Sequence, residues 1–148
     1  MKFQFRLEKV LQHRKRLESL AQKDFYEIDE ILRKEKEFLK AMIREISLAR
    51  NRALHLQSSG GKPQMELAEI DQFIKGQDVR IERQQSKVKE IEKLVEVKRE
   101  ILQQRSIEYK IIEKLKEKKK DEVQSEILKE EQKVLDEQSS IRLFYKGD

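Results

Sequence analysis

The sequence contains no cysteine and no tryptophan, only one proline and only four glycines among its 148 residues. Without cysteine the chain can form neither disulfides nor thiolate metal sites. No apolar run approaches the ~20 residues that a membrane-spanning helix needs. The N-terminal MKFQFRLEKV also lacks the apolar core of a signal peptide. These absences predict a cytoplasmic protein without direct membrane insertion.

What the chain does contain is charge. Charged residues make up 43% of the sequence and hydrophobic residues 36%, a composition typical of long exposed helices. Disorder is the other interpretation of so much charge, but it does not explain regular apolar spacing. The apolar residues suffice for a narrow helical seam rather than for a globular interior.

One segment interrupts the helical pattern. Gly60 and Gly61 can take the positive φ that ends a helix, and Pro63 suits the first turn of a new one. We therefore expect a helix over residues 3–57, a turn over residues 58–63 and a helix over residues 64–143.

Both predicted helices carry apolar residues at heptad spacing, the pattern of a coiled coil. In the first helix the seam is interrupted by one four-residue slip, a stutter. Before it the seam consists of Leu7, Val10, Arg14, Leu17 and Ala21; after it, of Phe25, Ile28, Leu32, Glu35, Leu39, Met42, Ile46, Ala49, Ala53 and Leu56. The second helix has one apolar row (Ile74, Ile81, Val88, Val95, Leu102, Tyr109) and one mixed row (Ile70, Gln77, Gln84, Ile91, Lys98, Arg105, Ile112). A mixed row often fixes the register of a coiled coil.

A short turn makes each helix the nearest partner of the other, so the expected fold class is all-α. We predict one antiparallel two-helix coiled-coil hairpin over residues 1–148, with a longer second helix and a monomeric chain. A parallel homodimer through one arm is the alternative. Pairing about the turn places residue 7 near residue 114, and the last ~25 residues then have no partner within the chain.

No residue pattern indicates catalysis. His13 and His55 are ~63 Å apart on one helix and cannot share a metal. Gly60-Gly61 lacks the G-x-x-x-x-G-K pattern of a phosphate loop. The sequence predicts a non-enzymatic protein with no catalytic, cofactor-binding or metal-binding residues.

Charge is distributed unevenly. Residues 1–23 hold seven Lys/Arg against two Glu, and residues 110–120 hold six Lys against two Glu, whereas residues 121–148 hold eight acids against four bases. The hairpin places the two basic stretches together. Stacking aromatics are missing, and the acidic tail would repel phosphates, so a protein partner is favoured over nucleic acid.

Several large apolar residues lie off the seam, where a two-stranded coil cannot bury all of them. They are Ile31, Phe38, Ile43, Phe73, Ile101 and Ile111. Phe38, Ile43 and Phe73 are in the turn-proximal half, away from the basic end. We therefore expect two binding regions.

The two ends of the sequence resemble the FliJ family, the small coiled-coil proteins of the bacterial flagellar type III export apparatus. The start matches Phe-x-Phe-x-Leu-x-x-Val-Leu, through Phe3, Phe5, Leu7, Val10 and Leu11. The far end, Gln132-Lys133-Val134-Leu135-Asp136-Glu137, is similar to the closing Gln-Lys-x-hydrophobic-Asp-Glu of the family.

The resemblance implies a stalk, similar in fold to the central stalk of rotary ATP synthases. It implies three kinds of partner: the hexameric export ATPase, the cytoplasmic domain of the export gate protein, and export chaperones. The location would be the cytoplasm, peripherally at the inner-membrane export apparatus. The alternative function is a chaperone or escort adaptor for secreted flagellar subunits.

Site residues follow from the same resemblance and from the charge pattern. The expected ATPase-binding residues are Phe5, Arg6, Leu7, Val10, Leu11, Arg14, Lys15, Asp136 and Glu137. The expected gate-binding residues are Phe38, Ile43 and Phe73.

Overall fold

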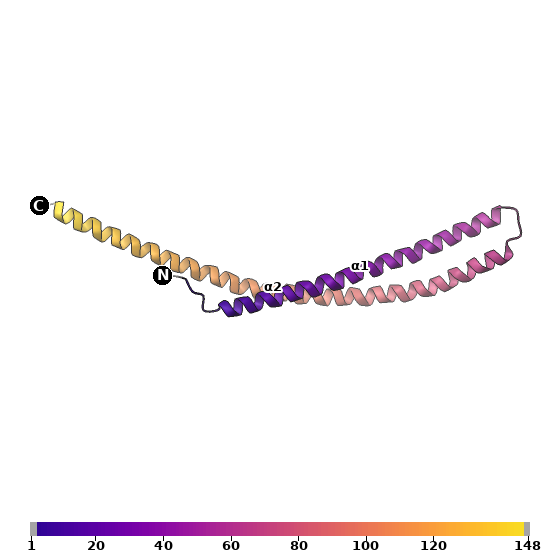
Figure 1. Cartoon of the computed structure of the whole chain (residues 1–148), viewed down its shortest axis with the longest axis horizontal. Coiled ribbons are helices and arrows are strands. Elements are labelled where there is room, and N and C mark those ends of the chain that lie inside the picture. Colours follow the sequence, from indigo (N-terminus) through magenta and orange to yellow (C-terminus); the bar gives the residue numbers. More distant parts are fainter. Residues whose placement is uncertain (1–2, 147–148) are drawn as a thin grey trace. The chain divides into compact units, whose positions relative to one another are not determined.

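The computed structural model describes residues 3–146 and contains two long helices (Figure 1), α1 over Glu8–Ser58 and α2 over Gln64–Lys146. Within the described residues there is no strand. The predicted all-α helical hairpin with a longer second helix is confirmed. The chain divides into two units. We call residues 20–102 the turn unit, and residues 1–19 together with 103–148 the terminal unit.

The first helix begins at Glu8, so the predicted start at residue 3 is wrong. Residues 3–5 are not helical, and Phe3, Phe5 and Leu7 are partly buried while Gln4 and Arg6 are exposed. This alternation is that of an extended segment, in which every second side chain points to the same face. A helix would place Phe3 and Phe5 on different faces, so only the extended form lets both aromatic rings contact α2.

The turn between the helices is closed by local hydrogen bonds. Ser58 Oγ donates to the carbonyl oxygen of His55, and Ser59 Oγ to that of Leu56, both at 3.0 Å. Gly60 has φ +78°, the left-handed conformation that glycine accepts readily. The amide of Leu67 donates to the Pro63 carbonyl at 2.9 Å and starts α2. The second helix begins at the predicted residue 64 and continues to Lys146, three residues past the predicted end.

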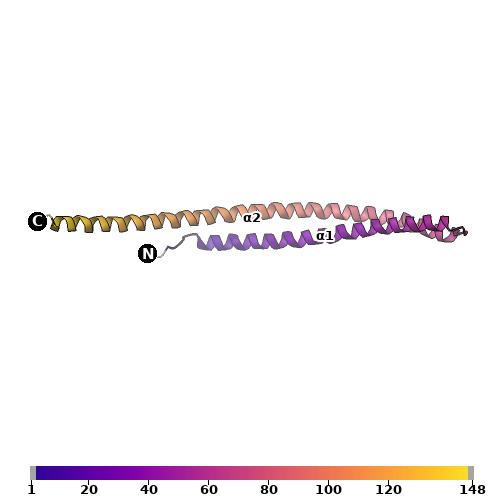
Figure 2. The same ribbon diagram turned by 90° about the horizontal axis from the view of Figure 1, so that it is seen from above.

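In the turn unit, α1 and α2 run side by side and antiparallel, as both views show (Figures 1 and 2). The apolar core consists of Leu32, Val88, Ile91 and Val95, with Phe25, Ile28 and Leu39 packed against it. These are the predicted seam residues. Burial of one apolar stripe on each helix is the main source of stability in such a pair.

Two glutamines of the mixed row are buried in this seam. Gln77 is 3% exposed; its Nε2 donates to the Met42 carbonyl at 3.2 Å and to Glu45 Oε2 at 2.8 Å. Seven residues on, Gln84 Nε2 donates to the carbonyl of Glu35 at 3.0 Å and to its carboxylate. The two glutamines are seven residues apart and so are their acceptors, so together they define one register between the arms.

In the terminal unit the seam residue is Leu11, 6% exposed, rather than Val10, 38% exposed. Leu11, Arg14, Glu18, Ala21 and Phe25 continue the three-and-four spacing of the later seam and are all buried or partly buried. The predicted seam is therefore wrong at Val10, while Leu17 is partly buried as predicted, and this spacing needs no stutter. The long heptad repeat that follows fixes the phase of α1, although this phase brings the charged residues Arg14 and Glu18 to the seam.

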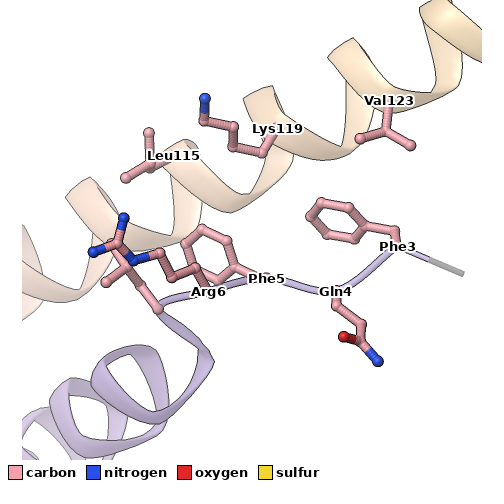
Figure 3. A pocket seen from close by; sticks show the side chains of 8 residues that line it. Phe3, Gln4, Phe5, Arg6, Leu115, Lys119 and Val123 are labelled. Atoms are coloured by element: carbon pink, nitrogen blue, oxygen red, sulfur yellow. The ribbon is translucent and has the colours of Figure 1, made fainter.

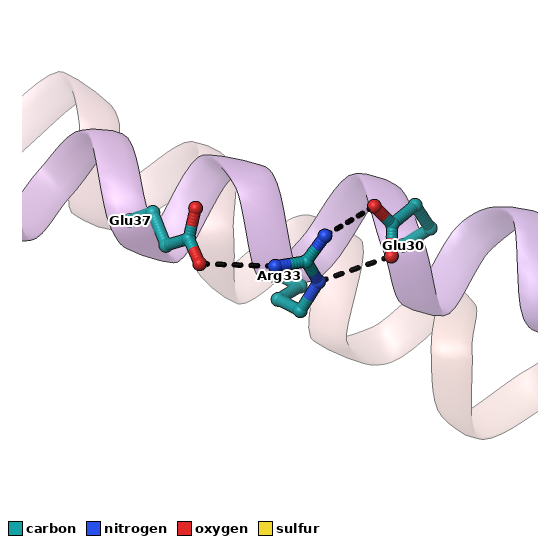
Figure 4. Close-up of polar contacts among 3 residues, drawn as sticks. All are labelled: Glu30, Arg33 and Glu37. Carbon is teal, nitrogen blue, oxygen red and sulfur yellow. Dashed lines mark hydrogen bonds and ion pairs between the residues drawn. The ribbon is translucent and has the colours of Figure 1, made fainter.

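The exposed surface carries short ion pairs along the helices. Arg33 contacts both Glu30 and Glu37 of the same helix (Figure 4). Because these side chains are about half exposed, solvent screens the pair and its contribution to stability is small.

Beyond Val123, α2 continues as an overhang, which we define as residues 124–146. Of residues 124–145 only Ile127 is partly buried, and the others are exposed. No helix in the described part of the chain is long and apolar enough to span a membrane.

Candidate functional site

An apolar groove lies in the terminal unit where the N-terminal segment runs along α2 (Figure 3). Its volume is about 570 Å³. In the close-up the rings of Phe3 and Phe5 lie between the segment and α2, and Gln4 points away. The lining residues are Phe3, Gln4, Phe5, Arg6, Leu7, Leu115, Lys119 and Val123. Leu7 and Leu115 share this groove, in agreement with the expected pairing of residue 7 near residue 114.

Basic side chains border the groove. Arg6 and Lys119 belong to its lining, and Lys116 and Lys120 line a neighbouring hollow that shares Phe3 and Phe5. The two basic stretches of the sequence therefore meet around an apolar centre. Such a surface suits a partner segment that combines an apolar anchor with acidic residues.

One of these lysines also holds the N-terminal part of α1 to α2. Lys116 Nζ lies 2.9 Å from Glu8 Oε2, and Gln12 Nε2 donates to Glu8 Oε1 at 3.1 Å. The hydrogen bond from Lys116, and after it that from Gln12, lowers the pKa of the Glu8 carboxyl below its ordinary value. The contact is thus stabilised by ionised Glu8.

This contact should depend on pH. A carboxyl whose folded-state pKa is depressed contributes stability above its unfolded pKa, and the contribution is lost as pH falls through the folded-state pKa. We expect acidification to below pH 4.5, the ordinary value for this group, to speed amide hydrogen exchange at the start of α1. The Glu8→Gln variant should lack this component. Equal pH dependence in the natural protein and the variant would contradict the role of Glu8.

Three of the seven expected ATPase-binding residues of the first arm are brought together at one groove. Phe5, Arg6 and Leu7 line the groove, while Val10 and Lys15 are exposed on the first turns of α1. Leu11 is buried in the seam, so it positions the helix instead of presenting its side chain. Arg14 is part-buried, and its Nη1 donates to the Glu108 carbonyl at 2.9 Å, which gives it a structural role.

Asp136 and Glu137 are not brought to this groove. They lie 13 and 14 residues past Val123 on the overhang, ~20 Å along a continuous helix. Both are exposed, and Asp136 Oδ1 accepts a hydrogen bond from Gln132 Nε2 at 3.1 Å. A partner that contacts both sets of residues must extend along the terminal unit.

A second groove, of about 410 Å³, lies near the turn. Its apolar lining consists of Leu48, Ala49, Ile70 and Phe73, and its charged lining of Arg52, Glu66 and Glu69. The Arg80 guanidinium carbon lies 5.9 Å from the centre of the Phe73 ring, a favourable cation–π geometry. Gly76 leaves room beside this contact, since a Cβ there would lie 3.3 Å from Arg80 Nη1 and the guanidinium would have to shift slightly.

Of the expected gate-binding residues, only Phe73 lines this groove. Phe38 and Ile43 are exposed on α1 of the turn unit, but neither contributes to the lining. Sequence reasoning missed Phe3, Leu115 and Val123 as groove residues, although the alternation of Phe3, Phe5 and Leu7 is a signal for an extended segment. It also missed Leu48 and Arg80.

No group of three His, Asp or Glu side chains that could hold a metal ion occurs within residues 3–146. His13 is in the terminal unit and His55 in the turn unit. Both side chains are exposed.

The helices, their heptad seam and the buried register glutamines define the class of protein: an all-α coiled-coil hairpin. The family model described as Flagellar FliJ protein matches residues 2–147. The chain therefore belongs to the FliJ family, which implies a non-enzymatic role related to flagellar protein export. Neither the curated proteins nor the solved structures contain a match to this chain.

Proposed function

We propose that the chain is a non-enzymatic stalk that couples the hexameric export ATPase to the cytoplasmic domain of the export gate protein. The terminal unit would bind the ATPase ring and the turn unit the gate. The work would take place in the cytoplasm, peripherally at the inner membrane. The observation that carries the proposal is a family match over nearly the whole chain in a hairpin that has an apolar groove in each of its two units.

The two grooves suit different partners. The terminal groove has a basic border, with Arg6, Lys116, Lys119 and Lys120. The turn-proximal groove has a border of mixed charge, with Arg52, Glu66 and Glu69. A coupling protein needs such a difference, because each end has to select its own partner.

Charge reversal at the terminal groove tests the ATPase contact. The purified chain should raise the ATP hydrolysis rate of its ring partner, and Arg6→Glu with Lys15→Glu should weaken binding about tenfold, which corresponds to ~1.4 kcal/mol. Both side chains are exposed, so the fold should persist. Lys40→Glu with Lys62→Glu, in the turn unit, is the matched control. An unchanged hydrolysis rate with the natural chain would overturn the proposal.

The gate contact is tested separately. Phe73→Ala should weaken binding to the cytoplasmic domain of the gate and leave stimulation of the ATPase intact. Tyr26→Ala, an exposed aromatic of the same unit, is the control. Loss of both activities in Phe73→Ala would argue for a general defect and against two separate surfaces.

An export chaperone or escort adaptor is the alternative function. The exposed apolar residues off the seam, among them Ile31, Phe38 and Ile101, favour it because they offer contacts for unfolded subunits. Capture of unfolded export substrates without any effect on ATP hydrolysis would select this alternative.

A further inference from the structure

The seam of the turn unit has two unlike flanks. In heptad letters, Phe25 and Leu32 of α1 and Val88 and Val95 of α2 occupy a positions. On the e flank, Lys36 and Glu92 form an ion pair across the arms at 3.5 Å. The g positions of α1 include Ile31 and Phe38, and those of α2 include Phe73, Leu94 and Ile101. All five apolar side chains are substantially exposed.

The g positions of both arms share one side of an antiparallel coiled coil, since e faces e and g faces g. The turn-proximal groove confirms this sharing, because Arg52 of α1 and Phe73 of α2, both at g positions, line it together. The apolar residues on this side recur at seven-residue steps, from Ile31 to Phe38 and from Leu94 to Ile101. A third helix with heptad apolar spacing fits such a side.

The overhang is a helix of that kind without a partner in its own chain. Ile127, Val134 and Ile141 recur every seven residues on it, and Val134 and Ile141 are more than half exposed. If the heptad repeat of the seam is extended along α2 into the overhang, its a positions fall on Glu130 and Glu137. The apolar stripe of the overhang is therefore offset from the seam and does not extend the pairing with α1.

Charge links the two surfaces. One side of the overhang stripe carries Glu126, Glu130 and Glu137 with the single base Lys133, and the other carries Leu128, Leu135 and Arg142 with the single acid Glu131. On the α2 side of the g flank, between residues 73 and 101, the bases Arg80, Arg83 and Lys87 outnumber the acid Glu90, whereas the α1 side is mixed, with Asp24, Glu27 and Glu45 against Lys34 and Arg52. A helix can lie along the flank in either of two directions. In one of them the acidic side of the overhang faces the bases on the α2 side of the flank, which is favourable.

We propose that the overhang of one copy docks along the g flank of the turn unit of a second copy, as the third helix of a mixed coiled coil. The overhang belongs to the same uninterrupted helix as the α2 part of the turn unit, and an uninterrupted helix cannot fold back alongside itself. The occupant is therefore another copy. If each of two copies docks its overhang on the other, the two contacts close a dimer. If each copy docks on a different neighbour, the contacts build an open head-to-tail assembly.

Sedimentation velocity of the full chain at rising concentration tests this association. We expect a concentration-dependent shift from monomer to dimer or larger species. Phe38→Asp on the flank and Val134→Asp on the overhang should each restore the monomer with unchanged helix content. Ile43→Asp, at an exposed e position of α1, is the matched control and should associate like the natural chain. A natural chain that stays monomeric at every concentration would overturn the proposal.

Disulfide trapping tests which flank the overhang occupies. The chain has no cysteine, so engineered thiols report single positions. A Val134→Cys variant mixed in turn with Ile31→Cys, Phe38→Cys, Leu94→Cys and Ile101→Cys variants should form a mixed disulfide with at least one of them under mild oxidation, whereas Ile43→Cys mixed with Val134→Cys should not. Trapping at Ile43→Cys equal to that at the flank positions, or none at any flank position, would exclude docking on the g flank.

Discussion

Val95→Asp should destabilise the hairpin by about 3 kcal/mol and melt most of the turn unit. Val95 is 4% exposed and belongs to the core cluster with Leu32, Val88 and Ile91. The substitution removes apolar packing and forces a carboxylate among the side chains of Leu32, Val88 and Ile91. Loss of a core side chain together with burial of a charged group is among the few single changes of this size. Urea unfolding followed by circular dichroism at 222 nm, the helix signal, would measure it.

Val79→Asp is the matched control for this prediction. The substitution is the same, but Val79 is 49% exposed and lies on the outer face of α2. Its effect should stay within about 0.5 kcal/mol, as for ordinary surface changes. Similar unfolding midpoints for the two variants would contradict the assignment of the seam.

The seam of the turn unit could be predicted from the sequence because a heptad repeat encodes the buried face directly. Ile81, Val88 and Val95 recur at seven-residue steps, and the structure places all of them against α1. The mixed row with Gln77 and Gln84 predicts that the arms have one fixed register. It does not predict which carbonyl oxygens of α1 accept the hydrogen bonds, so the alignment itself could not be derived from the sequence.

The errors arose where residue type and helical phase disagree. Val10 and Leu17 are apolar and were assigned to the seam, which required a stutter. In the structure, Leu11 is buried in place of Val10, and Leu17 and Glu18 are both partly buried, because an uninterrupted repeat keeps one phase along α1. The extended start of the chain was missed for a similar reason, since Phe3 and Phe5 lie directly before a strong helix pattern.

The candidate grooves depend on tertiary contacts that periodicity does not supply. The terminal groove needs an extended N-terminal segment lying on Leu115 and Val123. The turn-proximal groove needs Leu48 of α1 opposite Phe73 of α2. Each pair is far apart in the sequence, so the lining residues follow only once the register between the arms is known.

Replacing both register glutamines with leucine should stabilise the helices and weaken their specificity. Gln77 and Gln84 are buried in the seam, where leucine adds apolar contact worth roughly 1 kcal/mol per site. Their hydrogen bonds are modest in net effect. The acceptor carbonyls of Met42 and Glu35 lie inside α1, so both retain helical amide donors and are not left without a partner. We expect the unfolding midpoint in urea to rise.

The same double variant should lose its single register, because a polar residue at a seam position favours one alignment at a cost in stability. Sedimentation should then reveal species in which the arms of different chains pair, at concentrations where the natural chain gives one species. Gln72→Leu with Gln85→Leu, two exposed positions on the same helix, is the control and should change neither property.

A lower midpoint in the buried double variant would mean that the hydrogen bonds of Gln77 and Gln84 contribute more to stability than apolar contact does. In that case the mixed row would be a source of stability as well as of register, and the polar seam contacts of the terminal unit, such as Arg14 with the Glu108 carbonyl, would have to be interpreted in the same way.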